Sequence, residues 1–129
     1  MGNKRLQIAG AVAVVAVVSV IATTAMAGGD KGLHTRLTGF QEVPAVSTDA
    51  SGKFKAKLRH SSDEIHYELS YADLTGAVQQ AHIHFGQRAV NGGISVFLCS
   101  NLGNGPAGTQ PCPPPPATIT GTITPAQVV

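Results

Sequence analysis

Two histidines separated by one residue, His82 and His84, are the part of this chain best suited to chemistry. Side chains alternate between the two faces of an extended strand, so both imidazoles are expected on one face. Ala81, Ile83 and Phe85 would then lie on the opposite, apolar face. Neutral imidazole is a good ligand for zinc and copper. The pair therefore predicts half of a zinc or copper site, because such sites usually take three or four protein ligands.

Other polar side chains could complete this site if the strands pair in sequence order. His66 and Glu68 lie on the preceding predicted strand, on the face opposite to its apolar residues. If that strand pairs with the histidine strand across a turn at 72–76, His66 would approach the histidine pair. His34 or His60 could add a ligand. Two other interpretations stay open: a hydrogen-bonded polar pair that is neutral at pH 7, and a face that contacts a partner.

The elements expected to position these residues are all β-strands. Apolar and polar residues alternate with period two along most of the chain after residue 32, and Gly-, Pro- and Ser-containing turns separate the alternating runs. The expected strands are 33–38, 53–59, 64–71, 77–85, 94–99 and 118–124. No stretch of this part has an apolar stripe with helical spacing. We therefore predict a small antiparallel, Greek-key-like β-sandwich.

The N-terminal segment is typical of a secretory signal peptide. Lys4 and Arg5 precede an apolar run, and Ala25-Met26-Ala27 matches the small-residue pattern before a cleavage site. The predicted organisation is a signal peptide at 1–27, a flexible leader at 28–32 and one β domain at 33–129. A retained N-terminal anchor is the alternative. A cleaved product would be secreted, extracellular or periplasmic, with no membrane contact after cleavage.

Charge gives no reason to expect a nucleic-acid partner. The chain has nine Lys plus Arg and seven Asp plus Glu, and removal of Lys4 and Arg5 would balance the two at seven each. Basic residues do alternate with apolar ones from Lys53 to Arg59. This pattern favours the solvated face of a strand over a binding patch.

The two cysteines, Cys99 and Cys112, are expected to form a disulfide bond in an oxidising compartment. In the chain-entropy treatment, closing this loop would raise the free energy of unfolding by about 3 kcal/mol. The alternative of a thiolate metal pair would need closer spacing, such as Cys-x-x-Cys.

Three segments together resemble the CHRD domain, a module named after the extracellular protein chordin. They are residues 37–44 with 48–52, residues 81–86 with 90–92, and residues 97–100 with 112–113. The three segments occur in the order and with the spacing of the family, and the match spans nearly the whole chain after residue 32. The resemblance implies an all-β extracellular module whose molecular activity is poorly defined. The family usually has Pro after Glu42-Val43-Pro44, where this chain has Ala45. The family also continues well past the 120–124 segment, so we expect a sandwich that is incomplete at its C-terminal end, with exposed sheet edges.

These observations lead to one main functional expectation and one alternative. We expect an exported binding or structural module without catalytic turnover, whose partner is an unknown extracellular protein or a second copy. The alternative is a small secreted copper- or zinc-binding protein that uses the His82/His84 strand. The His-x-His pattern is similar to one metal-binding strand of copper–zinc superoxide dismutase. A dismutase needs further histidines and an aspartate that the Gly-rich loops here lack, and no nucleophile-elbow or phosphate-binding motif occurs. We therefore expect no enzyme activity.

Overall fold

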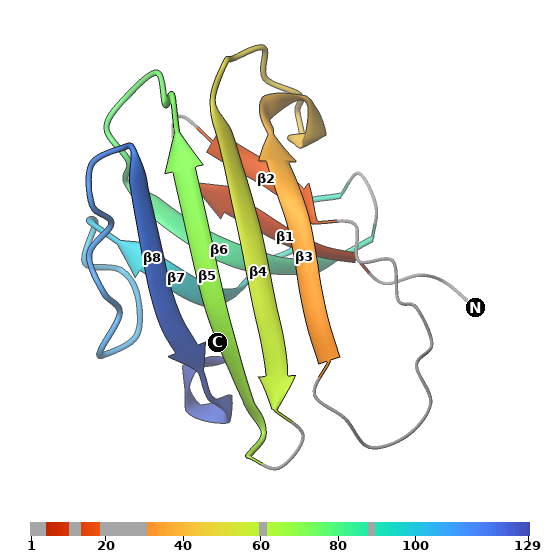
Figure 1. The fold of residues 1–129 in the computed structure, drawn as a ribbon, viewed down its shortest axis with the longest axis vertical. Helices are drawn as coiled ribbons and strands as arrows, with labels where there is room; N and C mark the ends of the chain where they lie inside the picture. The colour runs from red at the N-terminus through yellow and green to blue at the C-terminus, as the bar shows by residue number, and fades with distance from the viewer. Residues whose placement is uncertain (1–4, 11–13, 19–30, 60–61, 88–89) are drawn as a thin grey trace.

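The computed structural model describes residues 5–10, 14–18, 31–59, 62–87 and 90–129. Two four-stranded antiparallel sheets lie one behind the other, and their strands cross at an angle (Figure 1). The strands are β1 (Arg5–Gly10), β2 (Val14–Val18), β3 (Lys31–Thr38), β4 (Ser51–Arg59), β5 (Glu64–Ala72), β6 (Gln80–Gly86), β7 (Ile94–Ser100) and β8 (Ala117–Ile123), with short 3-10 helices η1 (Gly39–Gln41) and η2 (Pro125–Gln127). The predicted all-β antiparallel sandwich is confirmed.

The strand order shows where the chain changes sheets. One sheet has the order β3-β4-β5-β8, and the other has the order β2-β1-β6-β7. After β5 the chain crosses to the second sheet through residues 73–79, and after β7 it crosses back through residues 101–116. The expected pairing of the third and fourth strands is therefore wrong, because β5 pairs with β4 and β8 while β6 pairs with β1 and β7.

The core lies between the two sheets and follows the predicted alternation. On β5 the inward positions are Tyr67, Leu69 and Tyr71, and all three are buried. Phe54 and Leu98, which are about 1% exposed, are among the most deeply buried side chains in the described part of the chain. Burial of apolar surface on one face of each sheet provides the main stabilisation of such a sandwich.

One inward residue expected from the histidine strand is not buried. Ala81 and Ile83 are in the core, but the Phe85 side chain is 56% exposed. The β6–β7 pairing shifts register between Ala81 and His82 and again between Ile83 and His84, where it ends. Phe85 therefore extends past the paired part of β7 and is not covered by it.

Part of the predicted signal segment forms sheet in the structure. β1 pairs antiparallel with β6 from Arg5 opposite Gly86 to Gly10 opposite Ala81, and β2 pairs along the other side of β1. The predicted cleavage position after Ala27 lies outside the described residues. The predicted leader overlaps β3, which begins at Lys31. In the ranges that the structure describes, no helix has the length and apolar character needed to cross a membrane.

Candidate functional site

The two histidines of β6 lie together, as the strand geometry predicts. The centroids of the His82 and His84 rings are 4.7 Å apart, and the ring planes meet at 81°. The edge of the Phe97 ring, on β7 directly opposite His82, packs against His82 at a centroid distance of 5.8 Å. The pair is therefore a fixed feature of one sheet face, held by its own strand and by an aromatic neighbour.

Both rings carry a nitrogen atom that lacks a partner. The His82 side chain is 5% exposed, and His84 is partly buried. Nδ1 of each ring is buried and makes no hydrogen bond to the residues that the structure describes. A buried polar atom without a partner costs about 1–3 kcal/mol. The expectation of a fully hydrogen-bonded polar pair is therefore not met at these two buried atoms among the described residues.

Burial, together with a smaller effect of the neighbouring His84, lowers the pKa of His82 from 6.5 to about 4. His82 is therefore neutral at pH 7. Neutral imidazole is the form that binds a metal ion, so no proton has to leave His82 before a metal can bind.

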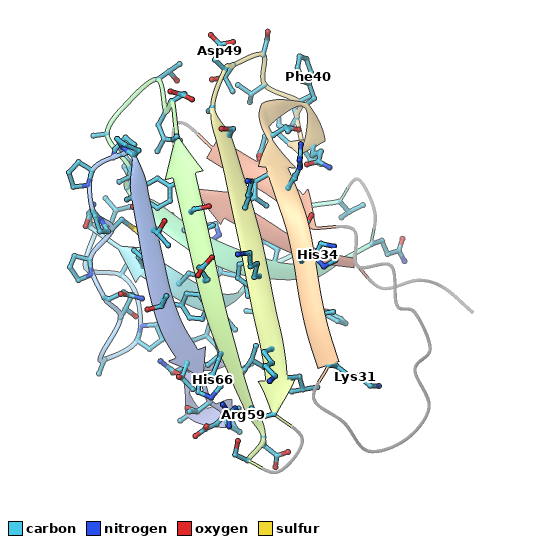
Figure 2. All side chains as sticks on the ribbon, viewed as in Figure 1. Lys31, His34, Phe40, Asp49, Arg59 and His66 are labelled. Atoms are coloured by element: carbon cyan, nitrogen blue, oxygen red, sulfur yellow. A yellow bond between two sulfur atoms is a disulfide. The ribbon has the colours of Figure 1, made fainter. Side chains whose placement is uncertain are left out.

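The other expected ligands lie elsewhere. His66 is on β5, in the other sheet, where its Nδ1 is 3.0 Å from Oγ1 of Thr122 and its Nε2 is 3.7 Å from a carboxylate oxygen of Glu64. Figure 2 shows His66 and His34 on the near sheet, whereas β6 lies behind it. His60 lies outside the described residues. His66 fails to join the pair because the chain leaves its sheet after β5.

The described part of the chain contains no group of three or more His, Cys, Asp or Glu side chains that could hold a metal ion. Within the described residues, the pair can therefore supply two nitrogen ligands. A metal ion held there would need its remaining ligands from outside the described residues.

The burial of Glu42 is not predicted by the sequence, which favours a hydrogen-bonding carboxylate at a strand edge over a catalytic acid. Glu42 follows η1, is 8% exposed, and its Oε1 has no hydrogen-bond partner within the described residues. Burial raises the pKa of Glu42 from 4.5 to about 8. The carboxyl group is therefore largely protonated at pH 7. The only local signal was an acidic residue between Phe40-Gln41 and Val43-Pro44, and this does not indicate burial.

The predicted disulfide is present. Cys99 and Cys112 are bonded, and both are buried in the core. Asn101 holds the base of the intervening loop, because its amide side chain accepts from the Cys112 backbone N–H at 2.9 Å and donates to the Cys112 carbonyl oxygen at 2.9 Å. The loop is thus anchored by both a covalent bond and hydrogen bonds.

By its fold, this protein is a small, disulfide-containing β-sandwich module. One of its strands carries the His82/His84 pair. A family model for the CHRD domain matches residues 33–128, so the chain belongs to the CHRD domain family. The resemblance carried by the three sequence segments is thereby confirmed. In the other comparisons, no curated protein and no solved structure matched this chain.

Proposed function

We propose that this chain is an exported module that binds or supports another extracellular molecule and catalyses no reaction. The membership in the CHRD family carries the proposal, because CHRD domains are extracellular and are not a known enzyme family. The buried Cys99–Cys112 disulfide supports export, since disulfides persist in oxidising compartments. The N-terminal charge and apolar pattern supports a secretory signal that is cleaved after Ala27.

The edge of β6 is the element that we propose for binding. In the full chain β1 covers this edge along residues 81–86. Cleavage after Ala27 would remove β1 and β2 and leave the backbone N–H and C=O groups of that edge without a strand partner. Such an edge accepts an added extended strand, in which main-chain hydrogen bonds supply affinity and side chains supply specificity. The proposed ligand is therefore an extended segment of another polypeptide.

Export is tested by producing the full chain in a secreting host and sequencing the N-terminus of the product outside the cytoplasm. Gly28 is the expected first residue. A product that starts at Met1, or that stays attached to the membrane, would contradict cleavage.

Strand addition is tested with the mature product and a peptide of the β1 sequence, Arg-Leu-Gln-Ile-Ala-Gly. Hydrogen exchange at the amides of 81–86 should slow when the peptide binds, while amides of β4 should not change. A scrambled peptide of the same composition is the control. Equal protection by both peptides, or none by either, would remove the β6 edge as the binding element.

A second candidate function is metal binding by the His82/His84 pair. Two neighbouring rings with unpartnered Nδ1 atoms, one of them neutral well below pH 7, support it. Imidazole suits copper and zinc. Because the described residues offer two nitrogens here, we propose a site that is completed by a ligand from outside the chain.

The metal proposal is tested by titrating the protein with Cu²⁺ and Zn²⁺. The expected result is sub-micromolar binding that is lost in the His82→Ala/His84→Ala double variant and retained in His66→Ala. The His66 variant is the matched control, since this histidine lies on the other sheet. Binding that survives the double variant would exclude the pair as the site.

A further inference from the structure

The outer face of the β3-β4-β5-β8 sheet carries a concentration of positive charge that β6 and its histidines do not share. Exposed cationic side chains on this face come from β3 and β4, hydroxyl side chains come from β5 and β8, and β5 also places Glu64 and Glu68 there, opposite Arg59 and Lys55. The cationic residues are Arg36, Lys53, Lys55, Lys57 and Arg59, and the hydroxyl residues include Ser70, Thr118, Thr120 and Thr122. From the sequence alone, the basic residues that alternate along β4 are expected to form only a solvated face. The sequence does not show which residues of the neighbouring strands lie beside them.

One cross-strand row places two of these cations next to each other. Arg36 is directly opposite Lys53, Lys53 is opposite Ser70, and Ser70 is opposite Thr118. Like charges directly opposite one another destabilise a sheet. The row therefore keeps an unfavourable pair of cations beside two hydroxyl groups, which is an arrangement suited to an anion.

The surface is hollowed at this row. An open hollow of about 600 Å³ is lined by residues that include Arg36, Lys53, Ser70 and Thr118, and none of its described lining residues is acidic. A bound anion would therefore meet two cations and two hydroxyl donors without a competing carboxylate.

A second hollow of about 470 Å³ lies at the neighbouring rows of the same sheet, and its lining includes Lys55 and Lys57 but also the carboxylate of Glu68. There Lys55 forms an ion pair with Glu68 at 3.0 Å, and Thr120 and Thr122 line the hollow with His66. The two hollows together give a surface with an anion-binding end and an end rich in hydroxyl and mixed polar groups.

We propose that this face binds an acidic polysaccharide, with a sulfate or carboxylate group held by Arg36 and Lys53. The planar guanidinium of Arg36 suits bidentate contact with such a group, and Lys53 adds a point charge. Ser70, Thr118 and Thr120 can exchange hydrogen bonds with sugar hydroxyls. No Phe, Tyr or Trp occupies the described outward positions of this sheet, so the face has no platform for stacking nucleic-acid bases. An acidic polysaccharide therefore fits the face better than a single-stranded nucleic acid does.

The test measures binding of the full chain to immobilised heparin for the sulfate source and polygalacturonate for the carboxylate source. Neutral dextran is the negative ligand, and single-stranded DNA is the competing polyanion. Binding to at least one acidic polysaccharide should weaken as salt rises, because ionic contacts release counterions. The arm with the stronger binding identifies the anionic group.

The variants are Arg36→Gln and Lys53→Gln, and Lys31→Gln is the charge-matched control. Lys31 is an exposed residue of β3 whose position has the opposite parity to Arg36. Each of the first two variants should weaken binding roughly tenfold, since one charge-assisted contact is lost. Lys31→Gln should bind like the parent. Arg36→Gln should also raise the midpoint of thermal unfolding slightly, because it removes the opposed cations.

Three results would overturn the proposal. The first is no binding to either acidic polysaccharide at low salt. The second is an equal loss in Lys31→Gln and Arg36→Gln, which would show a response to net charge alone. The third is stronger binding to single-stranded DNA than to both polysaccharides. None of these results bears on strand addition at β6, which is measured separately.

Discussion

The hydroxyl group of Tyr67, on β5 of one sheet, donates a 2.8 Å hydrogen bond to the carbonyl oxygen of Leu98, on β7 of the other sheet. Gln110, from the disulfide loop, donates from Nε2 to the Tyr67 hydroxyl at 2.8 Å and to the Leu98 carbonyl at 3.2 Å. One buried phenol thus connects both sheets and the loop that Cys99 and Cys112 close.

Tyr67→Phe should lower the free energy of unfolding by about 1–2 kcal/mol, because a buried hydrogen bond is lost without a change in ring volume. Urea unfolding of the parent and the variant measures this difference. Thr35→Val on β3 is a control, since that hydroxyl donates a hydrogen bond to the exposed carbonyl oxygen of the neighbouring Arg36. An unchanged midpoint for Tyr67→Phe would show that the phenol does not connect the sheets energetically.

Gly121→Ala should be among the more damaging small substitutions. A Cβ atom at Gly121 would lie 2.5 Å from the Tyr67 hydroxyl oxygen and 2.6 Å from its Cζ, so the ring would have to move. Overpacking of this kind typically costs about 1–3 kcal/mol. Gly32→Ala is the matched control, since a Cβ there meets nothing within 4 Å. Equal stability of the two variants in urea would contradict the close approach of Tyr67 to β8.

Glu42 should make stability fall as the pH rises. Its pKa is about 8 in the folded chain and 4.5 as the ordinary value, so the folded state keeps a proton that the unfolded state has released between these pH values. Folding therefore takes up a proton, and the contribution of Glu42 to stability is full below pH 4.5 and is lost towards pH 8. A shift of this size corresponds to roughly 3–5 kcal/mol.

Glu42→Gln tests this prediction, because the amide keeps the shape and cannot ionise. The difference in unfolding free energy between variant and parent should increase in favour of the variant from pH 5 to pH 8.5. A difference that stays constant with pH would show that Glu42 is ionised in the folded chain.

The contribution of His82 to stability should depend on pH in the opposite direction to that of Glu42. The folded pKa of His82, about 4, lies below the ordinary 6.5, so between these values the unfolded state holds a proton that the folded state does not. Its contribution to stability is therefore full above pH 6.5 and is lost as the pH falls towards 4, by roughly 3 kcal/mol. In metal-free protein with chelator present, His82→Phe should remove this part of the acid sensitivity, and the His66→Asn control should not. Identical pH profiles for parent and His82→Phe would mean that His82 is not buried in its neutral form.

Local patterns in the sequence were sufficient to predict the six strands β3 to β8 and the position of the core on most of them, but not β1 and β2, which lie in the predicted signal segment. The alternation on β5 identified Tyr67, Leu69 and Tyr71 as inward, and the His82/His84 spacing identified two rings on one face. The alternation rule failed at Phe85, which follows two register shifts in the β6–β7 pairing, and such irregularities interrupt the regular alternation of faces.

Sequence alone determined the fold class, the disulfide partners and the neighbouring histidines, because each depends on strand periodicity or on a small number of residues of one type. Only the tertiary structure decided which strands share a sheet. It separated His66 from His82, set Arg36 opposite Lys53, and buried Oε1 of Glu42 without a hydrogen-bond partner among the described residues. These relationships depend on crossings and contacts between segments distant in the chain, and a local pattern of side chains carries no information about which distant segment will lie beside it.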